Sequence, residues 1–230
     1  MSLENQDKNK LKDSLINQIL FGTQGYSPIK NPQGDEEQEL VSIGNPTYFC
    51  VGIVDIVDST RIIARLSPSQ SSKYYTIFLN EMAKIVRQYN GQVLKTMGDS
   101  LLFYFPETKH DERKFGFLSC IECGFAMINI HEKLKTLLFQ EMLPVINFRI
   151  SLDYGIVTMM KNNQFPIDLV GPTINTCAKI NGLCQENSMV VGSDLHEKIK
   201  SFKEYKFRNS KSFSIDLKHS YPVFSVCRNV

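Results

Sequence analysis

The alternation of hydrophobic and polar residues predicts strands and helices that follow one another over most of the chain. Residues 48–54 form a β-branched and aromatic run, which is typical of a central strand. A long helix is predicted from Pro68 onward, because Ser67 is a suitable N-cap, proline fits the first turn, and apolar residues then recur on one face. Gly91 is the expected end of this helix.

The next part of the pattern predicts a hairpin and a second long helix. Two short strands, 92–96 and 101–105, flank Met97-Gly98-Asp99-Ser100, a sequence typical of a tight turn. The remaining expected elements are short helices from Ser59 and over 193–199, helices over 111–139 and 173–183, and strands over 145–152, 156–160, 189–191, 205–207, 214–217 and 223–226. The order strand–helix–strand–strand–helix–strand predicts an α+β fold with a ferredoxin-like βαββαβ core and additional C-terminal strands and helices.

Residues 1–46 differ from the rest of the chain and are expected to form an N-terminal helix and linker. One amphipathic helix is predicted from Lys10 to Phe21, and glycines, prolines and an acidic stretch follow it. The simplest interpretation is a tether or a docking helix, and the alternative is a regulatory or dimerising arm. Residues 47–230 are expected to form a separate domain.

Composition and charge narrow the class of protein. Hydrophobic residues make up 42% of the 230 and charged residues 22%, which excludes a disordered chain and a collagen-like repeat. The formal net charge of +2 gives no reason to expect a nucleic-acid or anionic-membrane binder. No apolar run approaches the roughly 20 residues of a membrane span, and the N-terminus lacks the features of a secretion signal. We therefore expect a cytoplasmic protein whose partners include neither nucleic acid nor membrane.

The six cysteines are too few and too irregularly spaced for an extracellular disulfide framework. Cys120 and Cys123 form one C-x-x-C within a predicted helix, without the second pair of ligands that a zinc site needs. We interpret them as small residues that pack on one face of the helix.

Two aspartates are the candidate metal ligands. Asp55 interrupts an apolar strand and Asp99 lies in the predicted turn, and each alone has the ordinary explanation of a strand end or a turn. Right-handed crossovers place the third strand antiparallel beside the first, so both carboxylates should meet at one end of the sheet. Two carboxylates repel each other unless cations lie nearby, and Mg²⁺ favours one or two carboxylates together with phosphate oxygens.

Ser59 and Thr60 are the candidate phosphate contacts. They follow Asp58 directly and open a helix, and the backbone N–H groups at a helix N-terminus can receive phosphate. This combination predicts phosphoryl-transfer chemistry on a nucleoside triphosphate. The arrangement is not unique to one activity, because polymerase palms and cyclic-dinucleotide synthases place two carboxylates on similar sheets.

From residue 48 to residue 226 the sequence resembles the catalytic domain of class III nucleotidyl cyclases, the adenylate and guanylate cyclases. The resemblance rests on four segments in the same order, namely 49–60, 93–100, 148–155 and 168–175. It implies that Asp55 and Asp99, helped by the main-chain carbonyl group of Ile56, hold two Mg²⁺ or Mn²⁺ ions per site.

The resemblance also implies which residues contact the nucleotide. Lys95 and Asp168 occupy the purine-reading positions, and they suit adenine because a lysine can donate to N1 and an aspartate can accept from the 6-amino group. Guanine would usually require a carboxylate in place of Lys95. Asn175 would orient the ribose or the reacting phosphate, and Lys218 lies where the family places a lysine on the triphosphate. Lys179 replaces the family's transition-state arginine and supplies its charge without the planar fork.

The expected function is that of an adenylate cyclase, which converts ATP to 3′,5′-cyclic AMP and pyrophosphate by two-metal-ion catalysis. The resemblance implies a head-to-tail homodimer, with Asp55 and Asp99 from one chain and the nucleotide contacts from the other. Two alternatives remain open. One is a non-catalytic module that binds a nucleotide or only dimerises, which the replacement at Lys179 favours. The other is a cyclase for another nucleotide, either GTP or a pyrimidine.

Overall fold

The computed structural model describes residues 42–109, 114–161, 168–214 and 220–229 of the chain. The chain divides into two compact units, residues 1–38 and 39–230, and the fold described below belongs to the second. The helix predicted over residues 10–21 lies outside the described residues, as does Lys218. The first strand already begins at Ser42, so residues 42–46 belong to the sheet.

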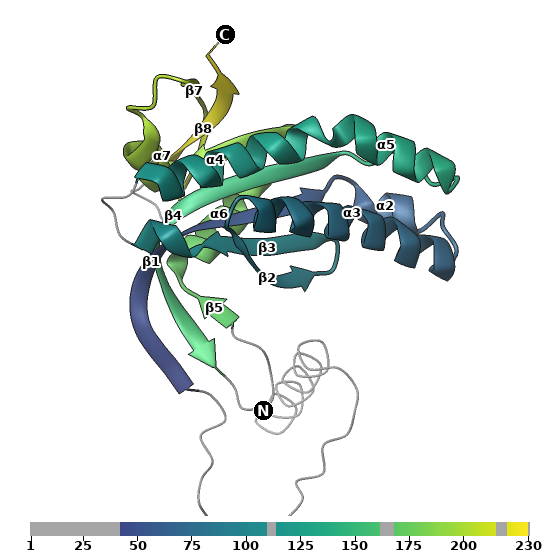
Figure 1. Ribbon diagram of the computed structural model, residues 1–230, viewed down its shortest axis with the longest axis horizontal. Helices are drawn as coiled ribbons and strands as arrows, with labels where there is room; N and C mark the ends of the chain where they lie inside the picture. The colour runs from purple at the N-terminus through teal and green to yellow at the C-terminus, as the bar shows by residue number, and fades with distance from the viewer. Residues whose placement is uncertain (1–41, 110–113, 162–167, 215–219, 230) are drawn as a thin grey trace, which may run out of the picture. The chain divides into compact units, whose positions relative to one another are not determined.

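An eight-stranded mixed sheet forms the centre of the domain (Figure 1). Its strands are β1 (Ser42–Ile56), β2 (Gln92–Met97), β3 (Ser100–Phe105), β4 (Phe148–Lys161), β5 (Asp168–Val170), β6 (Ser188–Gly192), β7 (Tyr205–Ser214) and β8 (Ser220–Arg228). Their order is β2-β3-β1-β4-β6-β8-β7, and β5 pairs with β4. Strand β1 is antiparallel to both neighbours, β3 and β4, so the predicted ferredoxin-like core is confirmed.

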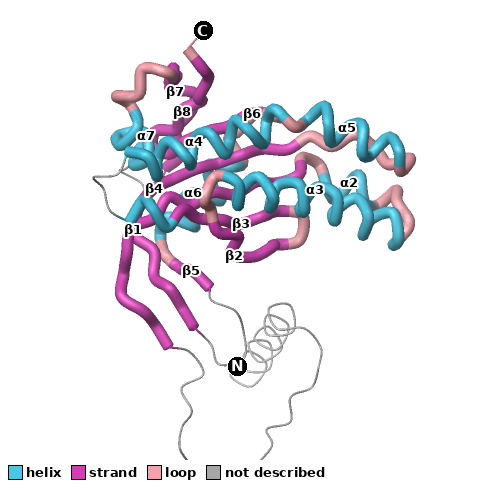
Figure 2. Tube along the Cα trace, viewed as in Figure 1, coloured by secondary structure: helices cyan, strands magenta, loops and turns pink. Residues whose placement is uncertain are grey.

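Helices lie on both faces of this sheet (Figure 2). They are α2 (Ser59–Ile63), α3 (Pro68–Gln88), α4 (Lys114–Asn129), α5 (His131–Gln140), α6 (Pro172–Asn181) and α7 (Ser193–Ile199), with a 3-10 turn at Pro106–Lys109. Helices α3 and α4 cover one face, and α6 packs on the opposite face against β1 and β4. Helix α3 starts where its sequence predicts, because Ser67 and Gln70 form a reciprocal capping box and Pro68 occupies the first turn.

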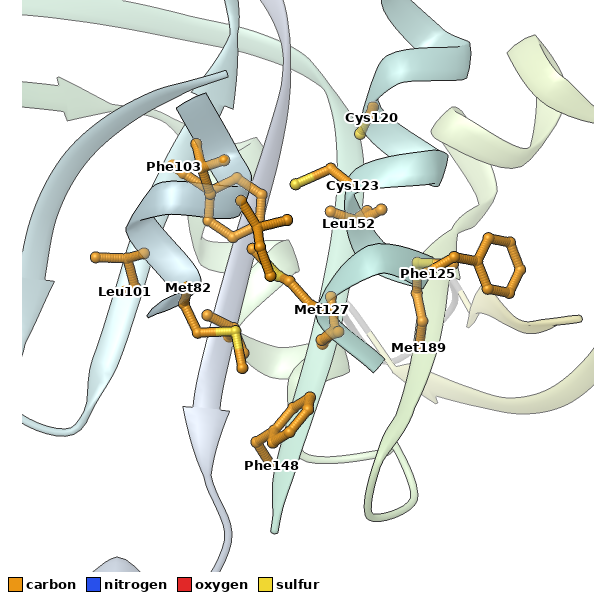
Figure 3. Close-up of a cluster of buried hydrophobic side chains, with 14 of the residues drawn as sticks. Met82, Leu101, Phe103, Cys120, Cys123, Phe125, Met127, Phe148, Leu152 and Met189 are labelled. Carbon is orange, nitrogen blue, oxygen red and sulfur yellow. The ribbon is translucent and has the colours of Figure 1, made fainter. Parts of the chain in front are cut away.

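The main hydrophobic core lies between the sheet and helices α3 and α4 (Figure 3). Met82 of α3, Phe103 of β3 and Phe148 of β4 are fully buried in it. Cys120 and Cys123 of α4 are also buried there, and the six cysteines of the chain are free thiols. The C-x-x-C therefore packs on a helix face, as predicted. Within the described residues, no helix is both long and apolar enough to cross a membrane.

Three sets of predicted boundaries are wrong. The strand expected over 205–207 extends to Ser214 as β7, which thus reaches the start of the strand expected over 214–217, and residues 215–217 lie outside the described residues. The helix expected over 111–139 is interrupted at Ile130, between α4 and α5, where neither glycine nor proline marks the break in the sequence. The strands expected over 145–152 and 156–160 are one continuous strand, β4. Gly155 does not end this strand. It makes room for Thr173 of α6, because a Cβ atom at position 155 would lie 2.6 Å from the Thr173 Oγ1 atom.

Candidate active site

The topology brings Asp55 and Asp99 to one end of the sheet, as the strand order predicts. Asp55 is the penultimate residue of β1 and pairs in register with Ser100, the first residue of β3. Asp99 precedes Ser100 in the two-residue turn, whose first residue, Gly98, has a φ of 65°. Glycine suits this conformation because L-residues with a side chain rarely adopt it.

The charge of Asp99 acts on the carboxyl group of Asp55. Burial raises the pKa of Asp55 above its ordinary value, and the negative charge of Asp99 raises it further, together with a side-chain contact between the two groups. The charge of Asp99 also reaches α3, where it adds to burial in raising the pKa of Tyr75. A site with two adjacent carboxylates favours a cation, because a cation removes their mutual repulsion.

Arg149 is a residue of this site that the sequence did not single out. It lies on β4 directly opposite Asp55 in the antiparallel register, and its Nη2 atom is 3.1 Å from the Asp55 Oδ2 atom. This contact lowers the pKa of Asp55, but burial and Asp99 have the larger opposite effect. In the sequence, Arg149 is marked only by its position in the 148–155 segment, and the cross-strand register is needed to interpret this position.

The donor set at this end of the sheet suits Mg²⁺ or Mn²⁺. Asp55 and Asp99 provide carboxylate oxygens, and Ile56 follows Asp55 with its side chain buried and its main chain at the strand end. Among the residues that the structure describes, no group of three or more His, Cys, Asp or Glu side chains converges. An ion here would therefore need water or substrate oxygens to complete its shell, which is the usual way in which Mg²⁺ binds.

Ser59 and Thr60 form the first turn of α2, immediately beyond the acidic pair. The preceding residue, Asp58, has a left-handed φ of 54°, and its Oδ2 atom accepts a hydrogen bond of 2.8 Å from Arg61 Nη2. The left-handed residue turns the chain sharply between β1 and α2. Ser59 is half-buried and Thr60 is exposed.

The two base-reading candidates contact each other. Lys95 on β2 and Asp168 on β5 form an ion pair with an Nζ–Oδ2 distance of 2.6 Å. The side chains keep 42% and 33% of their exposure, so the pair is open to solvent. Asp168 Oδ1 also accepts a 2.8 Å hydrogen bond from the backbone N–H of Leu169, which orients the carboxylate.

Helix α6 presents Asn175 and Lys179 one helical turn apart. Both side chains are exposed, whereas Cys177 and Ile180 are buried against the sheet. The start of α6 is specified by Gly171, whose φ is 148° and where a Cβ atom would lie 2.8 Å from the Ile156 carbonyl oxygen. Asn175 and Lys179 are thereby held on the outer side of the helix, on the same face of the sheet as Asp55.

Two cavities of the described part of the chain lie away from the candidate residues. A cavity of about 500 Å³ lies near Tyr48, Tyr154 and Asp194, and a second of about 420 Å³ lies along the first residues of β1. Neither is lined by Asp55, by Lys95 or by the other candidate residues. The described candidate residues therefore lie outside these two cavities.

Residues 44–226 match the adenylate and guanylate cyclase catalytic domain. The chain belongs to this family. A cytidylate cyclase from Staphylococcus aureus is 21% identical over 182 residues, covering 76% of this chain and 43% of that protein. An adenylate cyclase from Streptomyces coelicolor is 20% identical over 167 residues, covering 73% and 37%. This cyclase domain thus spans about two fifths of the length of the curated relatives it matches.

Solved cyclase structures share the fold of this cyclase domain. The adenylyl cyclase CyaB from P. aeruginosa superposes with a TM-score of 0.73 at 16% identity, covering 82% of this chain and 97% of that one. The guanylate cyclase domain of RhGC from Catenaria anguillulae, in complex with GTP, gives a TM-score of 0.68 at 18% identity, covering 81% and 100%. The family and fold predicted from the sequence are confirmed, while the relatives are named for three different bases.

Proposed function

We propose that this domain is an adenylate cyclase that converts ATP to 3′,5′-cyclic AMP and pyrophosphate. The observation that carries the proposal is that one chain of this family has both the Asp55–Asp99 pair and the Lys95–Asp168 ion pair. The two aspartates suit a cation that binds a triphosphate. The ion pair presents a hydrogen-bond donor beside an acceptor, as recognition of a base requires. A domain without catalytic function has no evident reason to keep both.

Asp55, Asp99 and the Ile56 carbonyl group are the proposed ligands of two Mg²⁺ or Mn²⁺ ions. Such ions, when bound, favour ionisation of the ribose 3′-hydroxyl and neutralise the triphosphate. In the reaction the ribose 3′-hydroxyl gives its proton to water and its oxygen attacks the α-phosphorus in line. A new phosphorus–oxygen bond forms, and pyrophosphate leaves with the electrons of the broken bond. The protein contributes mainly orientation and charge stabilisation.

The remaining candidates act on the phosphates and the ribose. Ser59 and Thr60, at the start of α2, are proposed to bind phosphate oxygens. Lys179 is proposed to stabilise the charge that develops at the α-phosphate, and Asn175, one turn earlier on α6, to orient the ribose. Lys218, outside the described residues, is proposed to bind the triphosphate.

We also propose that the active enzyme is a homodimer with two shared sites. Each chain would supply Asp55 and Asp99 to one site and the base-reading and α6 residues to the other. The presence of both sets of residues in this one chain supports this arrangement.

CTP is a second candidate substrate. Two curated relatives, from Staphylococcus aureus and Escherichia coli, are cytidylate cyclases. The chemistry of the Lys95–Asp168 pair is compatible with cytosine, because cytosine N3 accepts and its 4-amino group donates just as adenine N1 and its 6-amino group do. Guanine and uracil carry a keto group and an N–H at these positions, so the pair disfavours both.

The test is to incubate the full chain with Mn²⁺ and each of the four ribonucleoside triphosphates, and to identify cyclic products by mass spectrometry. Cyclic AMP as the main product supports the proposal. Cyclic CMP as the main product would mean that the substrate is CTP rather than ATP. Cyclic GMP or cyclic UMP as the main product would contradict the role given to Lys95 and Asp168. Absence of every cyclic product, in a protein that is folded, favours a non-catalytic module.

Two variants control this assay. Asp99→Asn removes one proposed metal ligand at nearly constant volume and should abolish the product. Glu132→Gln makes the same chemical change at an exposed carboxylate that pairs with Lys135 on the surface of α5, and should leave the rate unchanged. An equal loss of activity in both variants would show that the assay responds to the folding of the protein rather than to the metal ligand.

A further inference from the structure

Arg149 is the cation that faces the acidic pair from β4. Its Nη2 atom lies 3.1 Å from the Asp55 Oδ2 atom, and the two side chains retain 26% and 23% of their exposure. The pair is thus shielded from solvent more than Lys95 and Asp168 are. Electrostatic interaction between partly buried charges is stronger than between fully solvated ones, so Arg149 has a substantial effect on Asp55.

The contact does not use the full hydrogen-bonding capacity of the guanidinium group. Arginine and carboxylate commonly form two parallel hydrogen bonds, and a single one is recorded here. The Nε atom of Arg149 is buried and has no hydrogen-bond partner among the described residues. A buried donor without a partner is costly, so this pose of Arg149 is not one that the surroundings fix firmly.

A metal ion and the guanidinium group need the same carboxylate. Two carboxylates lie together at Asp55 and Asp99, and Arg149 offers one positive charge against their two negative charges. A divalent ion would neutralise the pair fully, but Arg149 already contacts one of the two Asp55 oxygens. The cation held by the protein and the cation from solution therefore exclude each other at this oxygen or repel each other beside it.

We infer that Arg149 is a built-in counter-ion that occupies Asp55 in the metal-free domain and competes with the first metal ion for it. The inference rests on the proposed function, because it takes Asp55 as a metal ligand. It predicts that Arg149 lowers the affinity of the free domain for metal. A purely structural arginine, which only held the Asp55 carboxylate in its orientation, would have the opposite effect or none.

The experiment measures Mn²⁺ binding to the full chain without nucleotide, by the loss of the free-ion signal in electron paramagnetic resonance. Arg149→Met should tighten Mn²⁺ binding about five- to tenfold, as expected for the removal of one positive charge a few ångströms from the ion. Arg149→Lys retains the charge and should stay within about twofold of the wild type. Arg149→Gln is a second neutral variant, for use if the Met variant does not fold.

Arg228→Met is the matched control. Arg228 Nη2 pairs with the Glu122 Oε2 atom at 2.6 Å, so the variant also removes an arginine from a carboxylate, but away from the acidic pair. Its Mn²⁺ affinity should equal that of the wild type. Unchanged or weaker binding in folded Arg149→Met or Arg149→Gln would overturn the counter-ion role. A wild type that binds no Mn²⁺ even with ATP, or binds it equally well as Asp99→Asn, would instead overturn the proposed metal site.

Discussion

The Lys95 ammonium group and the Asp168 carboxylate, 73 residues apart in the sequence, form an ion pair of 2.6 Å between β2 and β5. These strands are not hydrogen-bonded neighbours in the sheet, since β5 pairs with β4. A hydrogen-bond donor and an acceptor are thus placed side by side before any base is present. Because the pair is exposed, it contributes about 1 kcal/mol or less to the stability of the fold. Substitution of either residue therefore tests nucleotide binding rather than stability.

Lys95→Ala should lower kcat/KM for the preferred triphosphate about 10- to 100-fold. The reason is the loss of a charged donor to the base, a hydrogen bond worth about 1.5–3 kcal/mol. Lys95→Glu should lower it further and shift the remaining activity toward GTP, because a carboxylate accepts from the guanine N1–H. Initial rates of cyclic nucleotide formation with each triphosphate provide the measurement.

Lys135→Ala is the control for this effect. Lys135 forms an ion pair of 2.7 Å with Glu132 on the surface of α5, so it matches Lys95 in residue type and in partner. Its removal should leave kcat/KM unchanged. Equal selectivity among the four bases in the wild type and Lys95→Ala would mean that the base is read elsewhere.

Lys179→Arg should raise kcat about three- to tenfold, and Lys179→Ala should lower it about 100-fold. Arginine offers two parallel donors to a phosphate, whereas lysine offers a single charged point, and loss of the charge removes stabilisation of the transition state. Single-turnover rates separate this effect from product release. The same substitutions at Lys206, an exposed lysine of β7, serve as the control. If Lys179→Ala retained the full rate, Lys179 of α6 would not act on the reacting phosphate.

Asp153 should make the stability of the domain depend on pH. Burial raises the pKa of its carboxyl group to about 7, against the opposing effects of the Tyr154 N–H and of the Tyr221 hydroxyl, which lies 2.9 Å from both oxygens. The folded domain therefore holds this proton more tightly than the unfolded chain does. The stability that results is fully present below the ordinary value of 3.8 and is lost as the pH rises through about 7.

Asp153→Asn removes this proton and should flatten the dependence. The free energy of unfolding of the wild type, relative to that of the variant, should fall by about 2–3 kcal/mol between pH 5 and pH 8. Urea unfolding at several pH values measures it. Glu186→Gln, at an exposed carboxylate, should show no such change relative to the wild type. A difference that stays constant with pH would show that the Asp153 carboxyl group does not titrate in this range.

Local signals in the sequence account for much of the fold. Ser67 and Pro68 locate the start of α3 because a capping box and proline are properties of neighbouring residues. The break at Ile130 and the continuity of β4 through Gly155 depend on tertiary packing instead. Glycine often ends a strand, but Gly155 lies within β4 because Thr173 of α6 approaches it closely.

Some contacts of the candidate site could likewise be predicted from the sequence, and others could not. Convergence of Asp55 and Asp99 follows from strand order alone, and the structure places them together. The partnership of Arg149 with Asp55 spans 94 residues and depends on the β1–β4 register, which no local pattern reveals. The pairing of Lys95 with Asp168 depends in the same way on where β5 folds back along β4.

Gly52→Ala should destabilise the domain by about 1–3 kcal/mol. Gly52 lies in the middle of β1, where a Cβ atom would lie 2.4 Å from the Phe103 ring and 2.7 Å from Leu152. Gly182→Ala is the matched control, because its Cβ atom would lie 3.5 Å from the Lys179 carbonyl oxygen in right-handed helical backbone. Urea unfolding should show a loss at position 52 and a change within about 0.5 kcal/mol at position 182. Equal stability of the two variants would contradict this packing.

A shared site predicts that two variants with impaired sites restore activity to each other. Asp99→Ala lacks a proposed metal ligand and Lys95→Ala lacks a proposed base contact, so each homodimer has two defective sites. In a mixed dimer one site carries both changes and the other carries neither. With random exchange, half of all dimers are mixed and each has one intact site, so the mixture should reach about a quarter of the wild-type rate.

The experiment must show that the two variants have exchanged subunits. Each variant carries a different affinity tag, and sequential purification yields the mixed dimer, whose rate per dimer should be about half that of the wild type. Asp99→Ala mixed with Asp55→Ala is the control, because both changes fall in the same proposed half of the site and every site stays defective. Inactive mixed dimers of the first pair would place Asp99 and Lys95 in one site of a single chain. Activity in the control pair would separate Asp55 from Asp99 and remove the basis for a common metal site.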